Sequence, residues 1–246
     1  MPFTQDLDRL QMMANFLLSE ASWAEFQRYL DFRAKGLRKM AMEALHSFVL
    51  NVERWDFEKR KSFVSWVSNR ATDFADQRLL ISNESLTRVV GPTIREWLSR
   101  EPGSSFAHYL SGKYCRGEDR DPLPLDAFRR SVTLDPSFQQ ARHAFIDWVS
   151  VHAEKNQHEL PYYGYLGPAD EDVCDLAEAL RMLLEVEHSL WRKTKQTELT
   201  ELFEAAAAWQ RFKQSGDRDF VSWCEANGGP LQFVTFAVPV EFDRRS

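Results

Sequence analysis

Two Glu-x-x-His patterns are the residues of this sequence best suited to chemistry. Glu43 and His46 form the first pair, and Glu185 and His188 form the second. A spacing of three places a carboxylate and an imidazole on one face of a helix. In helical bundles, two such pairs with a Glu from each of two further helices hold two metal ions. The pattern therefore predicts, as one alternative, a helical metal-dependent oxidase of the di-iron type.

Other signs of catalysis are missing from the sequence. It has no phosphate-binding glycine loop, no nucleophile elbow and no zinc-protease motif. Its three cysteines lie far apart and form no Cys-x-x-Cys pair for zinc or redox work. Supporting Glu residues for the di-iron pattern are not evident either. The sequence thus favours a non-enzymatic protein with no catalytic residues and no metal or other cofactor.

Charge and hydropathy restrict the partners that the chain can have. The formal net charge is −6, and 43% of the residues are hydrophobic. An acidic balance argues against nucleic-acid binding. No window approaches the 18 or so apolar residues of a membrane span, and the start of the chain lacks the pattern of a signal peptide. We expect a cytoplasmic protein without membrane insertion, whose partner is another protein.

The elements that must position these residues are helices, because apolar residues recur at steps of three and four along most of the chain. An aromatic residue followed three positions later by Trp occurs three times. The pairs are Phe63 with Trp66, Phe145 with Trp148, and Phe220 with Trp223. Positions i and i+3 share a helix face. We interpret the six residues as core residues of three amphipathic helices, not as a repeated binding motif.

Capping and breaking residues predict where several helices begin and end. Asp56 is expected to cap a helix that runs toward Leu80, and the acidic residues 170–172 are expected to open another. A further helix is predicted from about Thr197 to Phe212. The predicted fold class is all-α, with an extended tail at 231–246.

A repeat with a period of 34 residues lies in the middle of the chain. Glu101-Pro102 recurs as Asp135-Pro136, and Ala107 recurs as Ala141. This is the length of a helix-turn-helix repeat of the tetratricopeptide type. Proline cannot continue a helix, so a proline at this interval ends one helix and sets the start of the next.

Residues 105–138 resemble one tetratricopeptide unit. Gly112 stands at the small position where the two helices cross, Phe128 is the large packing residue, and Ser131 fills the next small position. Pro136 ends the unit. Other positions depart from the family: His108, Ser111, Cys115 and Pro124 stand where Trp, Leu, Tyr and Ala are preferred. The resemblance covers this unit, half of the preceding one and the first helix of the next, at 139–154. It implies packed helical hairpins, a fold used mostly for protein binding.

The sequence divides into four segments, which we expect to form one compact domain. They are an N-terminal helical bundle at 1–83, tetratricopeptide-like hairpins at 84–156, a loop with capping helices at 157–230, and the extended tail at 231–246.

Candidate binding residues follow from the resemblance and from one loop. Arrays of this family bind ligands on the concave face, where His108, Lys113 and Arg142 are expected to point away from the core. The loop after residue 157 contains Tyr162, Tyr163 and Tyr165, and tyrosine is common among binding hot spots. These tyrosines could anchor a partner, in one contiguous interface with Arg142, or they could plug the end of the helical array.

The predicted function is that of a dedicated partner protein of bacterial type. An immunity protein that neutralises a toxin, or an adaptor or chaperone for a secreted effector, would have this size, acidity and helical content. Besides the oxidase, a second alternative is a regulatory domain that senses a peptide or small molecule.

Overall fold

A computed structural model describes residues 8–13, 23–74, 77–115, 123–160 and 163–230. All regular secondary structure within these ranges is helical, which confirms the all-α prediction. The predicted extended tail at 231–246 lies outside the described residues. The chain divides into two compact units, Met1–Asp135 and Pro136–Ser246.

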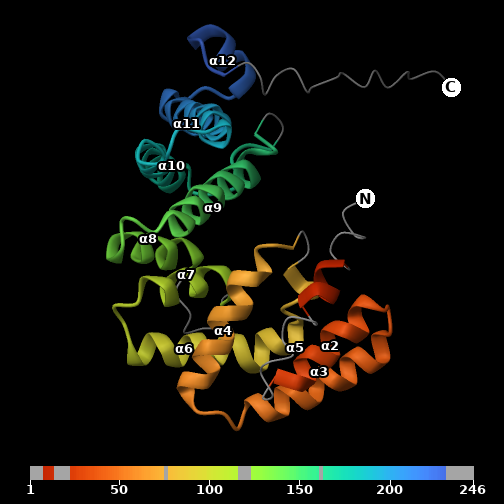
Figure 1. The fold of residues 1–246 in the computed structure, drawn as a ribbon. Helices are drawn as coiled ribbons and strands as arrows, with labels where there is room; N and C mark the ends of the chain where they lie inside the picture. Colours follow the sequence, from red (N-terminus) through yellow and green to blue (C-terminus); the bar gives the residue numbers. More distant parts are fainter. Residues whose placement is uncertain (1–7, 14–22, 75–76, 116–122, 161–162, 231–246) are drawn as a thin grey trace, which may run out of the picture. The chain divides into compact units, whose positions relative to one another are not determined.

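The first unit begins with residues 8–13, which are helical, and continues with helices and helical turns of varied length (Figure 1). These are α2 (Ala24–Ala34), α3 (Arg38–Val52), α4 (Phe57–Ala71), η3 (Gln77–Leu79), α5 (Asn83–Ser85), η4 (Leu86–Val90), α6 (Gly91–Arg100), α7 (Ser105–Tyr114) and α8 (Pro124–Leu134). α2 and α3 pack side by side as a hairpin. Gly36, with φ of 70°, makes the bend between them.

Aromatic rings form the core between α2, α3 and α4. Phe26 lies 5.0 Å from Phe48 and 5.2 Å from Phe63, measured between ring centroids, and all three are buried. Asp56 caps α4 as predicted, since its carboxylate accepts a hydrogen bond from the Lys59 amide at 2.8 Å. The predicted extension toward Leu80 is wrong. The Thr72 hydroxyl donates to the Asn69 carbonyl, which competes with continuation of the helix after Ala71.

A π-helical turn, η4, joins α5 to α6. The Gly91 amide donates to the Leu86 carbonyl, five residues earlier. Pro92 follows, and a proline ring would clash with the carbonyl four residues before it in a regular α-helix. The wider π turn removes this clash, so Pro92 accounts for the irregularity.

The hairpin of α7 and α8 has the close crossing that the sequence predicts. A Cβ atom added to Gly112 would lie 2.6 Å from the Phe128 ring, so only glycine fits without a shift. Ser131 is fully buried, and its hydroxyl donates to the Ser105 carbonyl at 2.7 Å. α6 joins this hairpin through a ring contact of 5.8 Å between Trp97 and Phe106. Packed helical hairpins are thus present where the repeat was expected.

The second unit consists of α9 (Gln139–Gln157), α10 (Ala169–Leu183), α11 (Leu190–Ser215) and α12 (Phe220–Asn227). Acidic residues open α10 as predicted. α11 begins seven residues earlier than predicted, because Ser189 caps it through the Arg192 amide at 3.1 Å.

Polar and aromatic pairs show how α9 and α11 are aligned. His143 stacks on Trp191 with ring centroids 4.2 Å apart, Lys195 lies 3.1 Å from Asp147, and the Ser150 hydroxyl donates to Glu198. Residue numbers increase together along both helices, so α11 runs parallel to α9. α10 packs against both. Two parallel helices with the intervening helix packed on them is the arrangement of successive units in a helical-hairpin repeat.

The aromatic pairs of the sequence are only partly core residues. Phe63, Phe145, Phe220 and Trp223 are buried, as predicted. Trp66 and Trp148 are half-buried, so the prediction is wrong for these two. Trp148 stacks on the exposed ring of His152 at 4.6 Å instead of entering the core.

Candidate functional site

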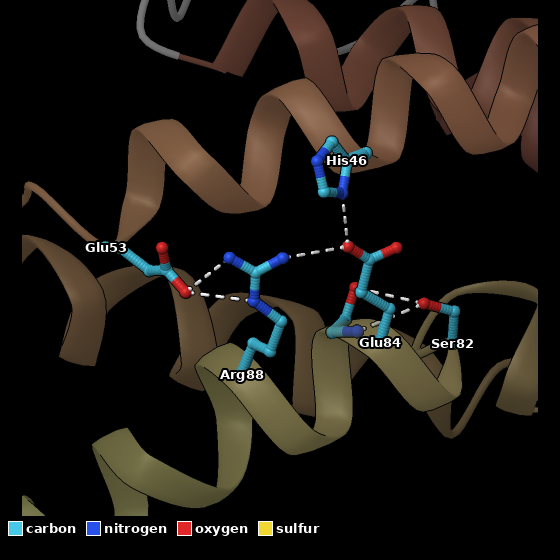
Figure 2. A network of polar contacts seen from close by, with 6 residues as sticks. His46, Glu53, Ser82, Glu84 and Arg88 are labelled. Carbon is cyan, nitrogen blue, oxygen red and sulfur yellow. Dashed lines mark hydrogen bonds and ion pairs between the residues drawn. The ribbon is translucent and has the colours of Figure 1, made fainter.

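The first Glu-x-x-His pair takes part in a polar network between α3 and the α5–η4 segment (Figure 2). His46 Nδ1 lies 2.9 Å from Glu84 Oε1, and Arg88 lies 3.2 Å from the same oxygen. Arg88 also lies 2.8 Å from Glu53. The His46 imidazole therefore meets a carboxylate from another helix, and the network ties α3 to the π-helical turn.

The second pair does not have the geometry on which the metal interpretation depends. Glu185 and His188 follow the end of α10 at Leu183, so they lie in a turn and not on one helix face. The two pairs also belong to different units of the chain. Among the residues that the structure describes, no group of three or more His, Cys, Asp or Glu could hold a metal ion.

Arg142 is buried, which corrects the expectation that it points away from the core. Its side chain is 3% exposed and lies 2.6 Å from the Glu185 carboxylate. It also donates to the carbonyl of Pro136 at 2.6 Å. Arg142 thus joins the start of α9 to the turn after α10. Loss of the Glu185 carboxylate would leave the Arg142 charge buried and without its ion pair, so this contact has a structural role.

His108 and Lys113 are half-buried residues of α7. His108 Nε2 lies 3.0 Å from the Pro102 carbonyl oxygen. The Lys113 ammonium lies 5.7 Å from the centroid of the Tyr109 ring and 5.2 Å from that of Tyr114, and burial lowers the pKa of this lysine. Both residues belong to the first unit, whereas Arg142 belongs to the second.

The described tyrosines of the loop between α9 and α10 have opposite environments. Tyr163 is 82% exposed. Tyr165 is half-buried, packs against the core cluster around Leu160 and Phe212, and donates from its hydroxyl to Asp172 Oδ2 at 2.5 Å. Burial and this hydrogen bond raise the pKa of Tyr165. Tyr162 lies outside the described residues. Of the two roles left open by the sequence, Tyr165 fits the plug, whereas Tyr163 is available as an anchor.

A buried polar cluster supports this loop. Asp172 is 5% exposed, and its Oδ2 also accepts a hydrogen bond from the Asn156 amide at 2.8 Å. Gln157 donates to the Leu202 carbonyl at 2.9 Å and lies 3.3 Å from the Tyr165 hydroxyl. None of these three residues was expected from the sequence to support the loop. The only signal was their position, at the last turn of one helix and the first turn of the next.

Two glycines bring the loop backbone close to its surroundings. Gly164 has φ of 87°, and a Cβ atom there would lie 2.8 Å from the Trp209 ring. At Gly167, a Cβ atom would lie 2.5 Å from the Asn156 side chain. Left-handed backbone and close approach both favour glycine. The loop is therefore closely packed beneath its exposed residues.

The exposed side of the loop combines apolar and acidic groups. Leu166 is 55% exposed and, with Tyr163, gives two large apolar side chains within four residues. Asp170 and Glu171 follow on the first turn of α10, both exposed. Neither forms an ion pair with any residue in the described part of the chain. We call residues 163–168 the tyrosine loop and regard it as the candidate binding site.

A hollow beside α11 gives little support to small-molecule sensing. One hollow of about 520 Å³ lies over a single face of α11. Its lining is Lys193, Gln196, Thr197, Thr200 and Glu201. Small-molecule sites are usually enclosed and lined mainly by apolar side chains. A polar face of one helix does not have this character.

Comparisons of the chain with protein-family models, with curated proteins and with solved structures find no match. None of the helices in the described ranges has the length and apolar character needed to cross a membrane.

Proposed function

We propose that the chain is a non-enzymatic, cytoplasmic protein-binding module built from tetratricopeptide-like helical hairpins, and that the tyrosine loop contacts its partner. The observation that carries the proposal is the exposure of Tyr163 and Leu166 on a loop supported by buried hydrogen bonds. Aromatic anchors dominate many interfaces. A preordered loop loses less conformational entropy on binding than a mobile one.

The hairpin packing supports the repeat-like part of the proposal. In the α7–α8 hairpin the small Gly112 packs directly beneath the large Phe128 ring, and α11 runs parallel to α9. Arrays with this packing expose extended surfaces to other proteins.

The partner we propose has a basic face with an apolar recess. Residues 136–246 contain 18 Asp and Glu against 11 Lys and Arg, a formal charge of −7, whereas residues 1–135 contain 19 against 20. Complementary charge speeds association and excludes unsuitable partners. In this proposal the exposed Asp170 and Glu171 meet cationic groups beside a recess that accepts Tyr163. Size, acidity and helical content suit an immunity protein, or an adaptor or chaperone for an effector.

The test is comparative capture from the native lysate. The bait is the wild-type chain, the double variant Tyr163→Ala/Leu166→Ala, or a control double variant Leu184→Ala/Leu190→Ala. The control removes side chains that are 64% and 81% exposed at the turn between α10 and α11. Circular dichroism checks that all three chains are equally helical.

We expect one stoichiometric partner on the wild-type and control baits. Loss of two anchors should weaken its binding by about 2–4 kcal/mol, at about 1–2 kcal/mol each, measured by titration calorimetry with the purified partner. Equal affinity for both double variants would exclude the tyrosine loop from the interface.

A further inference from the structure

The hydrogen bonds beneath the tyrosine loop converge on one atom. Asp172 Oδ2 accepts from the Tyr165 hydroxyl at 2.5 Å and from the Asn156 amide at 2.8 Å. The backbone of Asn156 is bonded to the loop as well, because its carbonyl accepts from the Leu166 amide at 2.9 Å. One carboxylate on α10 therefore connects the last turn of α9 with the middle of the loop.

We infer that Tyr165 is a positioning residue, whose hydroxyl holds the tyrosine loop, through Asp172, in the conformation that exposes Tyr163 and Leu166. The consequence for partner binding rests on the proposed function. The positioning itself is a property of the chain and can be tested without a partner.

The hydroxyl and the ring of Tyr165 have separable effects. The ring packs against the buried cluster that contains Leu160 and Phe212, a contact that phenylalanine would retain. Only the hydroxyl reaches Asp172. Hydrogen bonds to a charged acceptor are stronger than those between neutral groups. Loss of the hydroxyl should therefore release the loop locally while the apolar packing beneath it persists.

The buried Asp172 carboxylate is also stabilised by the hydrogen bond from the Tyr165 hydroxyl. This carboxylate is 5% exposed, and no Lys or Arg among the described residues forms an ion pair with it. The first turn of α10 contributes the positive end of the helix dipole. In the Tyr165→Phe variant, the carboxylate would retain only one side-chain donor, Asn156. A buried charged group that loses a hydrogen bond is costly, so the first turn of α10 should open more often.

The experiment compares Tyr165→Phe with the matched control Tyr163→Phe by amide hydrogen exchange. Both variants lose one hydroxyl from the same loop, but the Tyr163 side chain is 82% exposed. The key probe is the Leu166 amide, which is bonded to Asn156. We expect it to exchange at least about tenfold faster in Tyr165→Phe and at the wild-type rate in Tyr163→Phe.

An unchanged Leu166 exchange rate in Tyr165→Phe would overturn the inference. Should that variant fail to fold, Asp172→Asn removes the charged acceptor from the other side, and the same comparison applies. The proposed function fails on a separate result, namely equal partner affinity of Tyr163→Ala/Leu166→Ala and the control Leu184→Ala/Leu190→Ala. Faster exchange with undiminished partner affinity in Tyr165→Phe would overturn the role of positioning in binding.

Discussion

Replacing Gly112 with alanine tests the helix crossing on which the hairpin interpretation depends. The added Cβ atom would lie 2.6, 2.8 and 2.9 Å from three atoms of the Phe128 ring, whereas ordinary contact begins at 3.4 Å. The ring would have to retreat by about 0.8 Å in a close-packed interior. Phe128 is only 4% exposed, and its ring meets that of Tyr109 at a centroid distance of 6.2 Å, so retreat disturbs other contacts.

Two effects of opposite sign determine the stability of Gly112→Ala: higher helix propensity and overpacking of the core. Alanine in place of glycine inside a helix stabilises by about 1 kcal/mol through intrinsic propensity. Overpacking of a core typically costs about 1–3 kcal/mol, and the enclosed Phe128 ring places Gly112 in the upper part of that range. We therefore expect Gly112→Ala to lower the free energy of unfolding by about 1–2 kcal/mol.

Gly103→Ala is the matched control, because a Cβ atom there would have no neighbour within 4 Å. Its expected effect is neutral or slightly stabilising. Denaturant titrations, in which unfolding is monitored by hydrogen exchange of peptides from α7 and α8, measure the local free energy of unfolding. This readout is needed because two compact units need not unfold in one step. In the double variant Gly112→Ala/Phe128→Leu, a smaller side chain should relieve part of the clash, giving non-additive losses. If Gly112→Ala is as stable as Gly103→Ala, the close crossing is not a constraint.

Two further predictions concern the second unit. Phe145→Ala should cost about 3–5 kcal/mol of stability because the ring is fully buried, whereas Trp148→Ala should cost about half as much or less because its indole is half-buried. Equal losses in thermal unfolding would contradict the partial burial of Trp148. Burial beside Trp191 lowers the pKa of His143, so its neutral form is favoured on folding. The stability from this effect is complete above the unfolded pKa of about 6.5 and is lost as pH falls through the lower folded value. Unfolding of the second unit, measured between pH 7.5 and 5, should depend less on pH in His143→Gln, and an unchanged dependence would count against this explanation.

The sequence correctly predicted features that depend on residues close to one another along the chain. The Asp56 cap requires only an acceptor three residues before a free amide. The crossing of Gly112 under Phe128 joins residues 16 positions apart within one hairpin. Both patterns contain their own partners. The cap was expected from the residue types alone, and the crossing from the resemblance to a tetratricopeptide unit.

Features that depend on distant partners could not be predicted. Arg142 was expected at the surface because the tetratricopeptide resemblance places it on the concave face of a helical array. Its side chain is instead buried and pairs with Glu185, 43 residues later. His46 is a similar case, because its partner Glu84 lies 38 residues later in the chain. Arg142 also lies near the start of α9, about 20 Å along the helix from the tyrosine loop that follows its end. Arg142 therefore does not form one contiguous surface with Tyr163 and Tyr165, the two loop tyrosines that the structure describes.

The tyrosine loop shows why one residue type in one segment can have two roles. Tyr163 and Tyr165 are separated by Gly164, whose left-handed backbone lies against Trp209. On one side of this glycine the hydroxyl of Tyr165 reaches a buried carboxylate, and on the other side Tyr163 is exposed to solvent. Plug and anchor are therefore complementary in this loop, since the buried tyrosine fixes the backbone from which the exposed one projects. A partner surface that accepts Tyr163 would meet a side chain whose position is set from beneath, and the affinity of that contact would depend on a hydroxyl group that the partner never touches.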